Sequence, residues 1–221
     1  MSVSCPSDNK QGPCPAHLND LKSKMGLIVL QEWWGLNDQI KGEAAKIGKM
    51  GGFTTIVPDL YRGKTTIDNE EANHLMSNLD WPGAIEDIKA AAIYLKKNAN
   101  CSKVGVTGFC MGGALSLAAA SMISEIDAAA PFYGIPGPDF DLSKIRVPLQ
   151  CHFGKLDTIE GFSSPKDYNQ LKGKCSNAKK FDLFEYDAGH AFTNETSENY
   201  NPESCELALN RLVKFMKENL S

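Results

Sequence analysis

The stretch Val104-Gly-Val-Thr-Gly-Phe-Cys-Met-Gly-Gly-Ala114 decides the fold of this chain. It begins as a short apolar run typical of a buried strand and continues into small residues typical of a packed helix. Between them, Gly108-x-Cys110-x-Gly112 is the pattern of a nucleophile elbow, with cysteine in the position that serine usually holds. The flanking glycines allow a sharp turn that places Cys110 at a helix N-terminus, where the dipole favours a thiolate. The N–H of Met111 can then face a substrate oxyanion. The alternative interpretation is a tight glycine turn around an inert buried thiol.

Strands and helices are expected to alternate on both sides of this stretch. The apolar runs predict strands at residues 26–31, 53–57, 104–107, 126–132, 148–153 and 181–186. Helical periodicity and capping residues predict helices at 38–50, 68–79, 82–97, 111–123, 165–173 and 202–219. Strands separated by helices indicate parallel β-α-β units and a mostly parallel, doubly wound sheet flanked by helices. Residues 1–24 are rich in proline and lack periodicity, so we expect an irregular arm there and one α/β domain over 25–221.

Composition excludes several classes of function. The formal net charge is -4 over 221 residues, which gives no electrostatic case for binding nucleic acid or an anionic membrane. No apolar run approaches the roughly 20 residues that span a bilayer. Residues 1–11 are polar and lack the apolar core of a signal peptide, so we expect a cytoplasmic location. The seven cysteines are scattered and fit no zinc spacing, so we expect reduced thiols and no metal.

A cysteine nucleophile needs a base, and the base needs an orienting acid. Behind an elbow of this kind the chain order is nucleophile, acid, histidine. Two histidines follow Cys110. His152 lies inside a predicted strand and is expected to point into the packing, whereas His190 follows the last strand, where parallel sheets build their sites. Asp157 follows the preceding strand and is the expected acid, with Glu160 as its nearest rival; a solvated loop charge or a helix cap is the alternative interpretation of Asp157.

The sequence resembles the dienelactone hydrolase (carboxymethylenebutenolidase-like) family. The resemblance covers roughly residues 26–219, and its matching segments are Gln31-Glu-Trp-Trp-Gly-Leu-Asn37, Pro58-Asp-Leu-Tyr-Arg62, Gly108-Phe-Cys-Met-Gly-Gly113, Phe132-Tyr-Gly134, Gly154-x-x-Asp157 and Gly189-His190. The family implies an α/β-hydrolase fold, here with a reduced N-terminal part. It also implies hydrolysis of a small ester or lactone through a cysteine acyl-enzyme, with no metal or cofactor.

The resemblance implies further roles for residues near the elbow. Glu32 corresponds to the glutamate that holds the resting thiol and releases it when substrate enters. Trp33 lies in the loop whose backbone N–H is the second oxyanion donor beside Met111. Because Glu32 ends a buried strand, its charge needs a partner, and the Cys110 thiol and Arg62 are both candidates.

The substrate pocket is less defined by the sequence. Its candidate residues are Trp34, Arg62, Phe109, Tyr133, Phe192 and Asn194. The founding dienelactone enzymes bind the substrate carboxylate through arginines, but Asn194 takes the place of one, and His74 is the one basic side chain in the segment that holds the other. Alternative functions are a thioesterase or short-chain carboxylesterase on the same fold, a redox-sensing protein or a silent binding module. The expected partner is a small ester or lactone, and the expected assembly is a monomer or homodimer.

Overall fold

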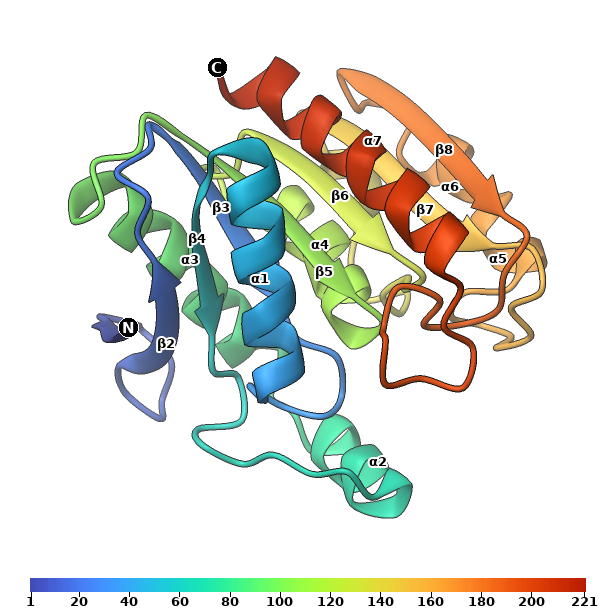
Figure 1. Cartoon of the computed structure of the whole chain (residues 1–221), viewed down its shortest axis with the longest axis horizontal. Helices are drawn as coiled ribbons and strands as arrows, with labels where there is room; N and C mark the ends of the chain where they lie inside the picture. Colours follow the sequence, from blue (N-terminus) through green and yellow to red (C-terminus); the bar gives the residue numbers. More distant parts are fainter.

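The computed structural model describes all 221 residues as one eight-stranded sheet with helices on both faces (Figure 1). The strand order is β1-β2-β4-β3-β5-β6-β7-β8. The strands are β1 Ser2–Cys5, β2 Cys14–Asn19, β3 Met25–Leu30, β4 Thr54–Pro58, β5 Lys103–Phe109, β6 Ala128–Phe132, β7 Pro148–Gly154 and β8 Lys180–Tyr186. Strands β3 to β8 pair in parallel, and β1 and β2 extend the sheet antiparallel at the β4 edge.

The helices form one layer on each face of the sheet. They are α1 Asp38–Gly51, α2 Asn69–Ser77, α3 Trp81–Lys97, α4 Met111–Met122, α5 Pro165–Tyr168, α6 Leu171–Lys174 and α7 Pro202–Leu220, with a 3-10 turn at Leu142–Lys144. Helices α1 and α7 contact each other on the near face in Figure 1, while α3 and α4 contact each other on the opposite face. None of these helices is long and apolar enough to cross a membrane.

The central strand and its helix are buried because of their small apolar residues. Val104 and Val106 of β5 are fully buried, and Thr107 Oγ1 donates a 2.7 Å hydrogen bond to the carbonyl of Ala130 on β6. Helix α4 is buried over ten consecutive residues, from Met111 to Ala120. Seven of those ten are glycine, alanine or serine, so the helix axis approaches the sheet closely and fixes the position of its first turn.

The predicted elements from residue 25 onward are confirmed, and their ends differ by at most two residues, with one exception. The helix expected over residues 165–173 is divided into α5 and α6. The N–H groups of Asn169 and Gln170 between them bond to Pro165 and Asp167. The mostly parallel, doubly wound sheet expected from the alternating pattern is present.

The prediction of an irregular N-terminal arm and a reduced N-terminal part is wrong. Residues 2–5 and 14–19 form β1 and β2, and β2 pairs with β4. Strand β2 has the period-two burial of a strand, with Cys14, Ala16 and Leu18 turned inward. Pro15 obscured this pattern because proline has no N–H, but its carbonyl still accepts a 2.8 Å hydrogen bond from the N–H of Asp59.

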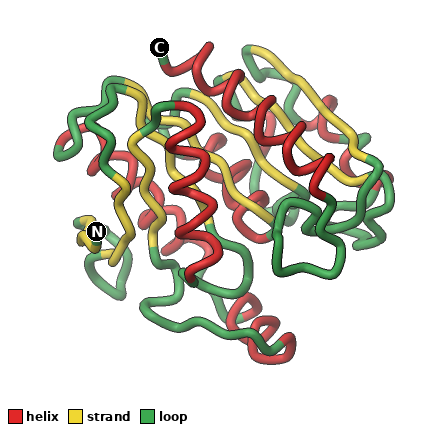
Figure 2. Tube along the Cα trace, viewed as in Figure 1, coloured by secondary structure: helices red, strands yellow, loops and turns green.

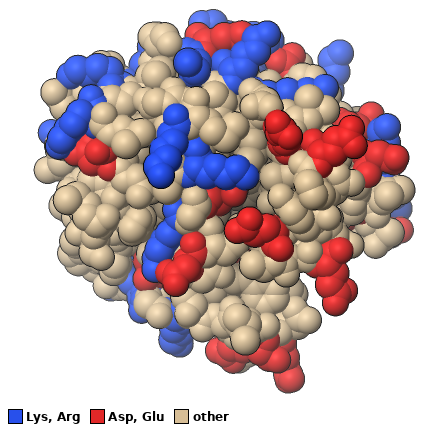
Figure 3. Space-filling model, viewed as in Figure 1, with Lys and Arg blue, Asp and Glu red and all other residues tan.

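The carboxyl ends of the parallel strands meet at one edge of the sheet, the lower edge in Figure 2, where loops gather. The segments that follow β3, β5, β6, β7 and β8 therefore lie near one another. Figure 3 shows both signs of charge on the face covered by α1 and α7, with basic groups mainly at the top and left and acidic groups mainly at the right and bottom.

Candidate active site

Cys110 occupies the strained turn between β5 and α4. Its backbone has φ 55° and ψ -117°, a conformation that costs a non-glycine residue about 1–3 kcal/mol. The strand-to-helix reversal requires glycine at positions 108 and 112. A Cβ on Gly112 would lie 2.5 Å from the Leu30 carbonyl oxygen, and a Cβ on Gly108 would overlap the Gly112 carbonyl. Cys110 is partly exposed, whereas every other cysteine is buried. The turn predicted from the Gly-x-Cys-x-Gly pattern is therefore present, and it presents this one thiol.

His190 and Asp157 form a hydrogen-bonded pair beside the elbow. His190 Nδ1 lies 2.7 Å from Asp157 Oδ2, and the side chains are 16% and 0% exposed. Asp157 is held by a 3.1 Å bond from the N–H of Ile159 to its other carboxylate oxygen. The two loops are tied together, because the N–H of Leu156 donates to the Ala188 carbonyl at 3.0 Å. Glu160 is exposed and makes no hydrogen bond or ion pair, so the geometry favours Asp157 as the partner of the imidazole.

His152 lies in the core, as the strand pattern predicts. Its ring is fully buried and stacks on Phe132 with centroids 4.3 Å apart. The two ring nitrogens are bonded to Gln150 Oε1 at 3.0 Å and to Tyr186 Oη at 2.8 Å. Burial lowers the pKa of His152 to about 3, so the ring stays neutral and structural near neutral pH.

Glu32 lies behind the elbow in a small polar network. The Asn194 amide donates a 2.7 Å hydrogen bond to Glu32 Oε2, and the Tyr133 hydroxyl donates a 3.3 Å bond to Oε1. The Tyr133 oxygen also lies 2.6 Å from Thr193 Oγ1, and its ring meets the His190 ring edge-on at 5.1 Å. Asn194, expected in the substrate pocket, therefore acts as a partner of the buried carboxylate.

Arg62 does not pair with Glu32. Its guanidinium donates two hydrogen bonds of 2.9 Å to the carboxylate of Asp87 on α3. It also donates to the carbonyl of Asp59 and to Cys14 Sγ, at 3.0 and 3.4 Å. The alternative in which Arg62 neutralises Glu32 is thus excluded, and the arginine that was expected near the substrate binds the N-terminal strands instead.

The electrostatics hold the Cys110 thiol neutral at rest. Burial raises the pKa of Cys110 well above its usual range, the Glu32 carboxylate raises it further, and the N–H of Met111 lowers it. Burial also raises the pKa of Glu32, against the lowering effect of Asn194 and Tyr133. The N–H at the helix N-terminus thus favours the thiolate, as expected, while desolvation and the neighbouring carboxylate act in the opposite direction.

The aromatic pocket candidates separate into core and loop residues. Phe109 and Phe192 are buried: Phe109 packs on Phe132 at 4.9 Å, and Phe192 packs on Tyr186, also at 4.9 Å. Tyr133 is fully buried beneath His190. Trp33 and Trp34 are half-buried in the loop after β3, with ring centroids 5.1 Å apart. The tryptophans thus remain as candidates for contact with substrate.

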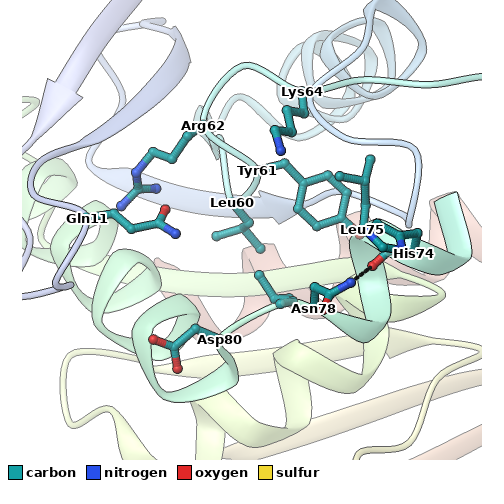
Figure 4. Close-up of a pocket in the computed structure, with 10 residues that line it drawn as sticks. Gln11, Leu60, Tyr61, Arg62, Lys64, His74, Leu75, Asn78 and Asp80 are labelled. Carbon is teal, nitrogen blue, oxygen red and sulfur yellow. Dashed lines mark hydrogen bonds between the residues drawn. The ribbon is translucent and has the colours of Figure 1, made fainter. Parts of the chain in front are cut away.

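A cavity of about 450 Å³ lies between the loop after β4 and the segment of α2 that follows it (Figure 4). Its floor is apolar, and its wall includes Tyr61, Arg62, Lys64 and His74. The Tyr61 hydroxyl donates a 3.3 Å hydrogen bond to Met111 Sδ, so one side chain links this cavity to the residue after the elbow cysteine.

No group of three or more His, Cys, Asp or Glu side chains is arranged to hold a metal ion.

Sequence reasoning missed two hydroxyl groups of the site. Thr193 binds Tyr133, and Ser163 Oγ lies 3.2 Å from His190 Nδ1. Thr193 could have been predicted to lie near the site, because it follows His190 by only three residues in the sequence. Ser163 has no such signal, because nothing local shows that its loop folds back onto the histidine.

The fold and these residues define a class of protein. A mostly parallel sheet carries Cys110 on a sharp strand-to-helix turn, followed in chain order by Asp157 and His190 as a hydrogen-bonded pair. This is the arrangement of an α/β-hydrolase.

Comparison with known proteins identifies the family. The model of the dienelactone hydrolase family matches residues 16–220, so the chain belongs to that family and is a hydrolase of ester or lactone bonds. It is 34% identical over 208 residues to "Protein usf" of Aquifex pyrophilus, covering 89% of each chain. It is 26% identical over 203 residues to the carboxymethylenebutenolidase of Pseudomonas putida, covering 86% of this chain and 84% of that one. The solved structure of a putative dienelactone hydrolase from Klebsiella pneumoniae superposes with a TM-score of 0.82 at 20% identity, covering 98% of each chain.

Proposed function

We propose that this protein hydrolyses a small ester or lactone through an acyl-enzyme on Cys110, with His190 as general base and acid and Asp157 as its orienting partner. The observation that carries the proposal is the pairing of His190 Nδ1 with the buried Asp157 carboxylate at 2.7 Å, at the sheet edge that presents the only partly exposed thiol. The pair leaves Nε2 of the imidazole without a partner in the protein, available to a thiol or a water.

The first half-reaction forms the acyl-enzyme. When the substrate displaces water around the elbow, His190 Nε2 takes the thiol proton, and the Cys110 sulfur attacks the carbonyl carbon. The Glu32 charge disfavours a free thiolate at rest, so the nucleophile forms only when substrate completes the site. The tetrahedral intermediate collapses, the C–O bond to the leaving group breaks, and His190 returns the proton to the departing oxygen.

The oxyanion of this intermediate needs two donors that are already in place. The N–H of Met111 lies at the N-terminus of α4, directly after Cys110, and lowers the pKa of its thiol. The N–H of Trp33 follows β3, the strand next to β5, and donates to no backbone carbonyl. We assign these two groups as the oxyanion hole, because Met111 directly follows Cys110 and Trp33 follows the neighbouring strand β3 with its N–H free of a backbone partner.

The second half-reaction returns the enzyme to its resting state. His190 removes a proton from a water molecule, which attacks the thioester carbon, and the same imidazole reprotonates the sulfur as the carboxylic acid leaves. No step in this scheme requires a metal or a cofactor. The relative in Pseudomonas putida is a carboxymethylenebutenolidase, and a lactone is accordingly the first substrate class to test. A thioester or a short-chain carboxylic ester is the second class, because both use the same acyl intermediate.

The test is capture of the acyl-enzyme. A nitrophenyl ester should release a burst of nitrophenol equal to the enzyme concentration, and mass spectrometry should place the acyl group on Cys110. Cys110→Ala should lose nearly all turnover and stay folded. Cys101→Ala is the matched control, because Cys101 is a buried thiol just before β5, the strand whose other end leads into Cys110. Retained turnover in Cys110→Ala, or an acyl group on another residue, would overturn the proposal.

A further inference from the structure

Ser163 is a buried residue in the loop that carries the acid. Its relative exposure is 0%, and its hydroxyl has one hydrogen-bond partner, His190 Nδ1 at 3.2 Å. The same nitrogen is bonded to Asp157 Oδ2 at 2.7 Å. One side of the imidazole therefore faces two oxygen atoms from a single loop.

The chemistry of the three groups decides the direction of both bonds. A carboxylate only accepts hydrogen bonds, so the short contact with Asp157 requires a hydrogen on Nδ1. A ring nitrogen that carries a hydrogen has no lone pair to accept with, so the Ser163 hydroxyl cannot donate to it. Ser163 Oγ is therefore an acceptor, and the Nδ1–H is shared between a strong acceptor and a weaker one.

The loop fixes both acceptors through one residue. The N–H of Ile159 donates to Asp157 Oδ1 at 3.1 Å, and the carbonyl of Ile159 accepts from the N–H of Ser163 at 3.0 Å. Asp167 stabilises the outer part of the loop by accepting from the N–H of Gly161 at 2.9 Å and from the Ser164 hydroxyl at 2.6 Å. Ser163 is thus held against His190 by the same turn that holds Asp157.

We propose that Ser163 is a second positioning residue for His190, which fixes the plane of the imidazole by accepting from Nδ1–H on the side that Asp157 leaves open. A single acceptor lets the ring rotate about the hydrogen-bond axis, whereas two acceptors at different positions define its plane and the direction of Nε2. When His190 becomes positively charged during the reaction, the second oxygen also stabilises that charge. No proton moves to Ser163.

This inference rests on the proposed role of His190, and the test separates the two. Ser163→Ala should lower kcat about 3- to 10-fold, the loss expected for one weak hydrogen bond made to a charged transition state. KM should stay within about twofold, because Ser163 has no path to the substrate. Ser164→Ala is the matched control: it is the next residue in the same loop and nearly as buried, but its hydroxyl bonds Asp167, and its kcat should stay at the wild-type value.

A spectroscopic signature distinguishes positioning from a general structural role. The low-field proton resonance of His190 Nδ1–H should move in Ser163→Ala and exchange faster with water, because one acceptor and its cover are lost. It should be unchanged in Ser164→Ala. Asp157→Ala gives a second arm: in that background Ser163 is the remaining acceptor, so adding Ser163→Ala should cost more in kcat than it costs in wild type.

The outcomes are distinct. An unchanged kcat and an unchanged Nδ1–H resonance in Ser163→Ala overturn the inference while leaving the triad in place. An equal loss in Ser163→Ala and Ser164→Ala also overturns it, because the loop as a whole would then be responsible. Failure of the proposed function shows instead in Cys110→Ala, which would keep its turnover.

Discussion

Arg62→Leu should destabilise the protein strongly without impairing the active site. In the native state the guanidinium, 18% exposed, makes two 2.9 Å bonds to an Asp87 carboxylate that is 1% exposed. The carboxylate keeps two neutral donors, the Ser7 hydroxyl at 2.6 Å and the Asn9 amide at 2.9 Å. Removing the charged partner from a buried pair of this kind costs about 3–5 kcal/mol. For a chain of this length the melting temperature should then fall by about 6–20 °C.

The assay for Arg62→Leu is thermal unfolding together with esterase kinetics. A double variant, Arg62→Leu with Asp87→Leu, should recover much of the loss, because no unpaired charge remains. Lys89→Ala is the exposed control: its partner Glu86 lies 3.5 Å away with both side chains more than a third exposed, so the effect on unfolding should be small. A melting temperature within 2 °C of wild type, or normal stability with a lost kcat/KM, would refute the structural role and return Arg62 to the substrate site.

The remaining predictions concern the reacting groups. Iodoacetamide should modify Cys110 before any other thiol, with a rate that still rises at about pH 9.5, because burial and Glu32 raise the pKa of this cysteine. A rate curve with its half-point near pH 8.5, as for a free thiol, would contradict this. Glu32→Gln removes a negative charge that raises the pKa of Cys110, so the alkylation curve should shift to lower pH; an unmoved curve removes Glu32 from the mechanism. His190→Ala should lower turnover on the order of a thousandfold or more, and Asp157→Asn by less, measured as kcat on a nitrophenyl ester; the reverse order would show that orientation outweighs base catalysis.

The central fold and the order of the reacting groups follow from the sequence alone. The Gly-x-Cys-x-Gly pattern predicts the elbow because a side chain at Gly108 would collide with the Gly112 carbonyl within the turn; at Gly112 the collision would be with the Leu30 carbonyl of the neighbouring strand β3. The alternation of strand and helix patterns determines a parallel sheet, and such a sheet brings the segments after its strands to one edge. That is why the sequence by itself predicts Cys110, Asp157 and His190 at one edge of the sheet, in this chain order.

Contacts between distant segments were decided by the tertiary structure. The pairing of β2 with β4 and the binding of Arg62 to Asp87 join residues that no local pattern relates. The same holds for Asn194 and Glu32, which are 162 positions apart in the chain. The tertiary structure also decides the pKa of the resting thiol, because that pKa depends on how far the Cys110 sulfur is desolvated and on which charge lies beside it. Local sterics act through neighbours in sequence, whereas desolvation and hydrogen-bond pairing act through neighbours in space, and those exist only after the chain has folded.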